Sequence, residues 1–200
     1  METNDTRAGM SAIQSLSPRL LVAAVSTLVV MLEAGRQLSV GPWAEIVTRR
    51  TGVHPSERWD AALVQHCGYW SHFDHETERS AWPISAATSA EDFAAFGRAH
   101  GLLREEPQVG DILLQCNPAR RTFVRAGVVV RVVARGWWTP KRPYTDVLSV
   151  EGDTDGQGGL GGTEVFRVAR RTSASTGDRF LRWCDAERRS AEVSVVGKAA

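Results

Sequence analysis

Three carboxylates in this chain could supply acid–base chemistry: Asp60, Glu151 and Asp153. A pair of carboxyl groups can transfer the protons of glycan or amide hydrolysis when one group is protonated and the other is ionised. Arg125 could neutralise the same groups, because a guanidinium stays charged in proteins. We therefore favour a structural ion-pair cluster over an acid–base pair at these residues.

The cysteines offer a second chemistry, because a thiolate is a nucleophile. Cys67 follows Asp60 by about two helical turns, on nearly the same face of a helix. It is either a displaced nucleophile or a structural thiol, and we favour the second because free cysteine is among the most buried residue types. Cys116 is expected near the end of a strand and Cys184 in a packing position near the carboxyl terminus.

A histidine-containing segment could ligate a metal ion. His72, Asp74 and His75 lie close together in sequence, and Cys67 or Asp60 of the preceding helix could complete a site. Their spacing matches no established zinc pattern, so we predict a solvated polar loop with no metal and no other cofactor.

An aromatic pair, Trp137 and Trp138, precedes the turn of a predicted hairpin, and Lys141, Arg142 and Tyr144 follow within a few residues. Such a group of rings and cations fits a platform for carbohydrate or peptide, and it equally fits ordinary hairpin packing. The sequence leaves both interpretations open.

The carboxylate Asp60 belongs to the stretch Arg58–Trp70, which has the spacing of a buried helix. Apolar residues recur every three or four positions and predict one buried face. They are Trp59, Ala62, Leu63, Cys67 and Trp70. Asp60 falls in the first turn, near the positive end of the helix dipole, where a carboxylate is stabilised.

The remaining pattern predicts helices first and strands afterwards, which is the order of an α+β domain with an antiparallel sheet. Capping residues and apolar spacing predict further helices at 18–34, 42–50 and 90–100, with an irregular loop over 71–90. Alternating or valine-rich runs predict strands after Pro107, including 122–133, 145–150 and 164–169. The glycine-rich segment Gly152–Gly162 lacks the features of a phosphate-binding loop, so we expect a hairpin loop.

Composition describes one soluble globular domain. The chain has 200 residues, of which 42% are hydrophobic and 24% are charged. We expect an arm at 1–16, a single domain at 17–184 and a tail at 185–200. A net charge of +1 provides no overall field for nucleic acid or a membrane surface. Three cysteines make an odd number, which fits reduced thiols better than a disulfide framework.

The amino-terminal half has no predicted membrane span. Its longest apolar run, Leu20–Leu32, is about half of what a bilayer requires. The residues around this run do not form a clear secretory signal, so we expect cytoplasmic residence, with export by a non-standard route as the alternative.

Several segments, in order along the chain, resemble one known family. The stretch W-D-A-A-L-V-Q-H-C-G resembles the W-C-A-A-F-V-S-W-C signature of CHAP domains, which are papain-like cysteine amidases and endopeptidases related to NlpC/P60 peptidoglycan hydrolases. Three later segments are similar to family motifs, namely P-Q-V-G-D-I-L-L, R-A-G-V-V and V-E-G-D-T, which begin at Pro107, Arg125 and Val150. The segment G-D-R-F-L-R-W, Gly177–Trp183, is similar to the closing strand of the family. The resemblance covers roughly residues 20 to 183 and implies a papain-like α+β fold, with amino-terminal helices packed on an antiparallel sheet.

The resemblance places the family's catalytic positions on residues of other types. Its nucleophilic cysteine falls on Asp60, its histidine base on Arg125, its orienting acid on Glu151 and an accompanying asparagine on Asp153. A carboxylate beside a guanidinium keeps the charge signs of a thiolate beside an imidazolium, but arginine cannot accept the proton. The resemblance thus implies a pseudoenzyme with an Asp60–Arg125 ion pair, in which Glu151 or Asp153 is a second partner of Arg125.

Three functions follow from this resemblance. The first is a binding or interaction module without hydrolase activity, with peptidoglycan as the ligand that the family suggests. The second is an active amidase or endopeptidase that uses Cys67 or a carboxylate mechanism. The third is a protein partner in a bacterial system that keeps only the scaffold. None of the three involves nucleic acid.

Overall fold

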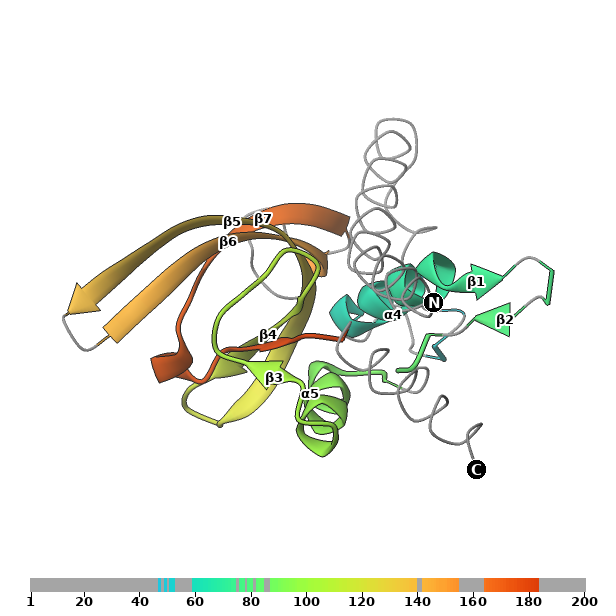
Figure 1. The fold of residues 1–200 in the computed structure, drawn as a ribbon, viewed down its shortest axis with the longest axis horizontal. Coiled ribbons are helices and arrows are strands. Elements are labelled where there is room, and N and C mark those ends of the chain that lie inside the picture. Colours follow the sequence, from blue (N-terminus) through green and yellow to red (C-terminus); the bar gives the residue numbers. More distant parts are fainter. Residues whose placement is uncertain are drawn as a thin grey trace, which may run out of the picture.

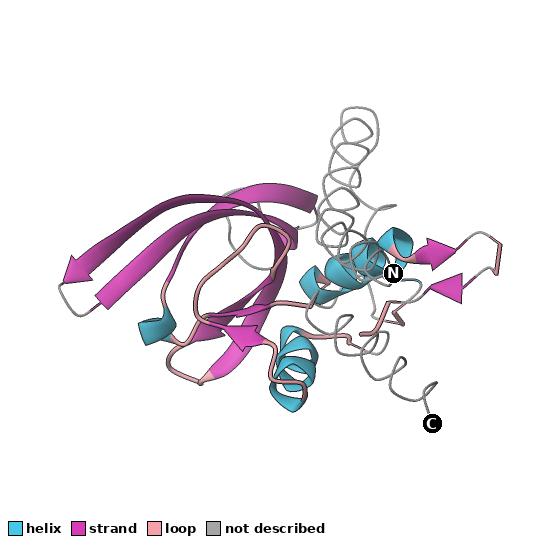
Figure 2. Ribbon diagram, viewed as in Figure 1, coloured by secondary structure: helices cyan, strands magenta, loops and turns pink. Residues whose placement is uncertain are grey.

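A computed structural model describes residues 47, 49, 51–52, 59–74, 76–77, 79–80, 82–84, 87–139, 142–154 and 164–183. The predicted arm at 1–16, the helix at 18–34 and the tail at 185–200 lie outside these residues, and of the predicted helix at 42–50 only Val47 and Arg49 are described, both helical. Figure 2 shows helices beside a curved sheet. Two helices of the described chain are α4 (Asp60–Ser71) and α5 (Ala90–Ala99).

The strands form one large and one small antiparallel sheet. The small sheet pairs β1 (Phe73–Asp74) with β2 (Arg79–Ser80). The large sheet has six strands in the order β3-β8-β4-β5-β6-β7. Their bounds are β3 Leu103–Arg104, β4 Ile112–Asn117, β5 Thr122–Thr139, β6 Arg142–Thr154, β7 Glu164–Thr172 and β8 Arg179–Leu181. A short 3₁₀ helix, Ala174–Thr176, precedes β8.

The α+β class and the antiparallel meander from β4 to β7 are confirmed, because each strand in this run pairs with the next. Two features differ from the prediction. Strand β5 continues past the predicted end at Val133 to Thr139. Strand β8 lies where the resemblance implies a closing strand, but its pairing between β3 and β4 was not predicted, because local patterns do not reveal long-range pairing.

The sheet has an apolar cluster on each face. Residues of β4 alternate between them: Ile112 and Leu114 join the larger cluster with α4 and α5, whereas Leu113 joins a smaller one with Val129 and Phe180. This alternation is the two-residue period of a strand that is covered on both sides. The larger cluster fixes α4 against β5 and β6.

Helix α4 is buried more widely than the single predicted face, because Ala61 to Val64 are all inaccessible to solvent. The prediction that Trp70 is buried was wrong, since its side chain is 46% exposed. Trp70 lies in the last turn of the helix, where its ring packs against Tyr69 and Phe73. The periodicity correctly identified a helix, but it could not show that the apolar face extends past the sheet.

Helix α5 agrees with its prediction and has a capping box at its start. Ser89 Oγ accepts the Asp92 N–H at 3.2 Å, and the Asp92 carboxylate accepts the Ser89 N–H at 2.9 Å. This reciprocal arrangement satisfies backbone donors that the first turn would otherwise leave unpaired. Phe93 and Ala94 then face the core.

The segment between the two helices belongs partly to the core. Trp82 and Ile84 are buried in the larger cluster, and His72 is buried with its ring 5.4 Å from Trp82 and 5.0 Å from Trp183. The predicted solvated loop was therefore wrong for His72. Nowhere in the described chain does a helix have the length and apolar character needed to cross a bilayer.

Candidate functional site

The first residue of α4 reaches strand β5. The Asp60 carboxylate accepts the backbone N–H of Ala126 at 2.7 Å, and the Asp60 residue is 4% exposed. On this side of β5, the pairing with β6 ends at Val128, which lies opposite Val150. Ala126 is two residues beyond that end of the pairing. The carboxylate thus supplies an acceptor to a buried backbone donor beyond that pairing. Asp60 is therefore adjacent to the strand residue that follows Arg125.

Arg125 itself forms a buried ion pair with Glu151. Arg125 Nη1 donates to Glu151 Oε2 at 2.7 Å, and the two residues are 2% and 0% exposed. The sequence analysis gave Glu151 or Asp153 as a second partner of Arg125, and the structure has the pair with Glu151. A direct Asp60–Arg125 ion pair stays a prediction.

Two further residues complete the surroundings of Glu151. Arg170 Nε donates to Glu151 Oε1 at 3.0 Å and its Nη2 donates to Oε2 at 2.6 Å, while the Ser149 hydroxyl also donates to Oε1. The sequence analysis did not identify Arg170 or Ser149. Ser149 could have been found from its spacing, because residues two apart in a strand share a face. Arg170 gave no such signal. We call Asp60, Arg125, Ser149, Glu151 and Arg170 the buried charge cluster.

Glu151 is held in its ionised form. Burial would raise the pKa of this carboxyl, but the hydrogen bonds and charge of Arg170, with the hydrogen bonds from Ser149 and Arg125, lower the pKa below its usual range. A carboxylate held in this way cannot act as a general acid near neutral pH. The cluster has the character of a structural ion-pair network.

The start of α4 packs tightly over β6. A Cβ atom placed on Gly152 would lie 2.6 Å from the Trp59 ring and 3.3 Å from Leu63 Cβ. Only glycine permits this approach between helix and strand. The next residue, Asp153, is buried and has a φ of 54°, in the left-handed region that aspartate tolerates better than most residues. The prediction of a hairpin loop beginning at Gly152 was wrong for residues 152–154, because β6 continues through Asp153 to Thr154, with Asp153 buried and Gly152 packed beneath the start of α4.

The thiols occupy ordinary packing positions in the described chain. Cys67 is fully buried in the larger apolar cluster, as predicted for a structural thiol. Cys116 is the penultimate residue of β4, and burial together with the charge of Asp178 raises the pKa of its thiol. Cys184 lies outside the described residues. A solvent-accessible thiolate is therefore not found at either described cysteine.

Metal-binding groups do not converge in the part of the chain that the structure describes, where no three residues among His, Cys, Asp and Glu form a group able to hold an ion. The backbone of Asp74 is described, but its side chain and His75 are not. His72 directs Nδ1 toward the Ser71 hydroxyl at 2.6 Å and the Gly68 carbonyl at 2.9 Å. The imidazole therefore links the end of α4 to the core.

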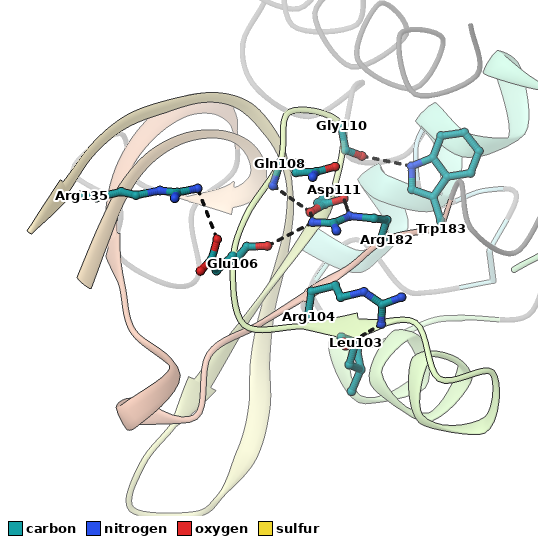
Figure 3. A network of polar contacts seen from close by, with 9 residues as sticks. All are labelled: Leu103, Arg104, Glu106, Gln108, Gly110, Asp111, Arg135, Arg182 and Trp183. Atoms are coloured by element: carbon teal, nitrogen blue, oxygen red, sulfur yellow. Dashed lines mark hydrogen bonds and ion pairs between the residues drawn. The ribbon is translucent and has the colours of Figure 1, made fainter. Parts of the chain in front are cut away.

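The loop before β4 is held by a second polar network, which contains the G-D pair of the P-Q-V-G-D segment (Figure 3). The Asp111 carboxylate accepts the Gln108 N–H at 2.8 Å and Arg182 Nη2 at 3.0 Å. The Trp183 indole donates to the Gly110 carbonyl at 3.0 Å. This loop therefore joins β4 to the chain that follows β8.

Comparisons of the chain with protein-family models, with curated proteins and with solved structures found no match. Function is therefore inferred from the side chains themselves and from the resemblance in sequence.

The exposed aromatic residues lie away from the buried charge cluster. Trp137 and Trp138 are 64% and 45% exposed at the far end of the β5–β6 hairpin, and Trp138 lies 5.5 Å from Tyr144 between ring centroids. Ordinary hairpin packing therefore covers only part of these indoles. The side chains of Lys141 and Arg142 are not described.

Proposed function

We propose that this chain is a CHAP-like domain of papain-like fold that has lost cysteine-hydrolase chemistry and acts as a binding module for peptidoglycan. The observation that carries the loss of chemistry is the buried pair of Arg125 and Glu151, joined at 2.7 Å. In the family that the sequence resembles, a histidine base corresponds to Arg125. A guanidinium already paired with a carboxylate cannot take a proton from a nucleophile.

The position that corresponds to the nucleophile supports the same proposal. Asp60 accepts a backbone N–H and is almost inaccessible. Its carboxylate serves as a hydrogen-bond acceptor between α4 and β5, a structural role. Cys67, the alternative nucleophile, is fully buried, so a substrate carbonyl could not reach its sulfur without opening of the core. We therefore favour a binding module over an active amidase.

Incubation with purified peptidoglycan tests both parts of the proposal. We expect the protein to sediment with the insoluble polymer and to release no new amino groups, measured with an amine-reactive dye. Cys67→Ala should change neither result. Amine release that disappears in Cys67→Ala would instead identify a working hydrolase.

A double substitution tests the relation to the family. Asp60→Cys with Arg125→His restores the residue types of a cysteine–histidine dyad, with Glu151 beside the introduced imidazole. Amine release from this variant would show that the rest of the site still admits substrate, but the burial of Asp60 and Arg125 leads us to expect none. The matched control is Asp60→Cys alone, which has the thiol without the base and should gain none.

A further inference from the structure

The two edges of the large sheet differ in length. At one edge β3 has two residues, whereas β7 at the other edge has nine, Glu164–Thr172. Figure 1 shows β7 along the border of the curved sheet, beside β6. Only one side of β7 pairs with a strand of the described chain, so the backbone N–H and C=O groups of its other side lie outside that pairing. Such a row of groups is a template for a further strand.

The features that usually block a long edge strand are weak in β7. Proteins protect such edges with short strands, prolines, bulges or charges. β7 contains no proline, and its register with β6 shifts only near its first residue. Two of its three arginines form ion pairs within the chain, Arg170 with Glu151 and Arg171 with Asp146. The edge therefore keeps the geometry of a strand that accepts a partner, and its paired arginines give an acidic peptide little advantage as that partner.

Side chains of β7 alternate between the two faces of the sheet. Arg167 and Ala169 are exposed on one face, whereas Val168 between them is 7% exposed on the other. A strand that extends this sheet must present residues to the same faces, because directly opposite residues lie on one face. A partner strand with the same sequence meets this condition when the two strands run antiparallel about a residue.

We propose that β7 pairs antiparallel with β7 of a second copy of this chain, across a two-fold axis at Val168, so that the two sheets become one. Val168 is the central residue of β7, so this register uses the whole strand. A two-fold interface is self-complementary, because each copy supplies the same groups. Each copy uses its long edge once, so the assembly ends at a dimer. This proposal does not depend on the proposed function.

The arginines of β7 select this register. With the axis at Val168, every arginine lies opposite an uncharged residue of the partner, namely Arg167 opposite Ala169, Arg170 opposite Phe166 and Arg171 opposite Val165. Moving the axis to residue 167 would place Arg167 opposite itself. Moving it to residue 169 would place Arg167 opposite Arg171. Like charges directly opposite each other destabilise a strand pair, so both neighbouring registers are disfavoured.

Sedimentation velocity over a dilution series tests for the dimer, and cysteine crosslinking tests its location. Val168→Cys places two thiols opposite each other on adjacent strands, within the Cα separation of a disulfide. We expect mild oxidation to give a disulfide-linked dimer on a non-reducing gel. The matched control is Val133→Cys on β5, since Val133 is 52% exposed and random collisions would crosslink it faster than residue 168. The unsubstituted protein gives the background from the native thiols, and circular dichroism melting checks that the variants fold.

A pair of charge variants tests the register. Ala169 is exposed and would lie opposite Arg167 of the partner at two symmetric positions. Ala169→Arg places like charges there, whereas Ala169→Glu places opposite charges. We expect the dimer Kd to be about tenfold higher for Ala169→Arg than for Ala169→Glu at low salt, with a smaller difference at high salt.

Three results would overturn the dimer through β7. They are a monomer at every concentration, crosslinking of Val133→Cys in place of Val168→Cys, and equal Kd values for the two variants of Ala169. Because none of these measurements uses peptidoglycan, each can fail while the proposed function stands.

Discussion

The Arg170 guanidinium holds the Glu151 carboxylate through two hydrogen bonds, from Nε to Oε1 at 3.0 Å and from Nη2 to Oε2 at 2.6 Å. Arg125 donates to the same carboxylate from the neighbouring strand β5. Strands β5, β6 and β7 are thus joined by one buried acidic side chain.

Acid should destabilise the domain through Glu151. Because the folded-state pKa of this carboxyl is lowered, its stabilising contribution is present above the unfolded carboxyl pKa of about 4.3 and is lost as the pH falls through the folded value. In Arg170→Gln the folded pKa should rise toward the unfolded value, so the variant should be less stable at pH 7 and should lose less further stability as the pH falls from about 5 to 3. Urea unfolding at a series of pH values from 7 to 3 measures this difference.

The control for the acid experiment is Arg171→Gln. Arg171 is the next residue along β7 and pairs with Asp146, but both side chains are much more exposed than those around Glu151. A surface ion pair contributes little to stability. A shift of the pH profile in Arg171→Gln as large as that in Arg170→Gln would contradict the assignment to Glu151.

Removal of the Asp60 carboxylate should leave the Ala126 N–H without this acceptor. We expect Asp60→Ala to lower the free energy of unfolding by about 2 to 4 kcal/mol, because buried polar groups are costly to leave unpaired. Asp60→Asn retains an oxygen acceptor and should cost less. Denaturant titrations compare these variants with Asp146→Ala, which removes a more exposed carboxylate and should change stability by less than about 1 kcal/mol.

A methyl group at residue 152 should separate α4 from β6. In Gly152→Ala the added Cβ would meet the buried Trp59 ring at 2.6 Å, and we expect a loss of about 1 to 3 kcal/mol in the free energy of unfolding. Gly136→Ala meets the Tyr144 ring at 2.5 Å, but that ring is only partly buried, near the end of the β5–β6 hairpin, and has more room to move than the buried Trp59 ring. Urea unfolding measures both variants. We expect Gly136→Ala to lower the free energy of unfolding by less than Gly152→Ala does, and an equal loss would contradict the tight packing of α4 on β6.

The two described thiols should differ in reactivity. Cys67 is fully buried and should react with a maleimide only after unfolding, whereas Cys116 is partly accessible. Burial and the nearby Asp178 raise the pKa of Cys116, so its labelling at pH 7 should be slower than that of a free thiol and should accelerate at higher pH. Peptide mapping by mass spectrometry follows each site. Labelling of Cys67 in the folded protein would contradict its burial.

Local patterns were sufficient for several elements. The apolar spacing of Phe93, Ala94 and Phe96 and the closing Gly101 predicted α5, because helical period and helix ends depend on neighbours within one turn; the capping box of Ser89 and Asp92 was found only in the structure. Asp60, Arg125 and Glu151 were grouped in advance by the resemblance. The structure places Asp60 against the residue after Arg125, and Arg125 against Glu151.

Other features depend on contacts that local patterns do not encode. Arg170 resembles any arginine of a strand until the register of β6 and β7 is known. The exposure of Trp70 depends on where the sheet beneath α4 ends. The long strand β5 and the return of β8 arise from pairing between distant segments, and sequence alternation identifies a strand without identifying its partner.

The return of β8 has a consequence for how the chain folds. Strand β4 is synthesised early, but its Cys116 N–H bonds to the Asp178 carboxylate 62 residues later, and β8 occupies the edge of β4 away from β5. Until that late segment leaves the ribosome, one side of β4 has exposed backbone groups that can pair with other chains. Folding of the sheet should therefore be completed after translation of the last strand, and a chaperone that shields the nascent β4 edge should increase the yield of soluble protein.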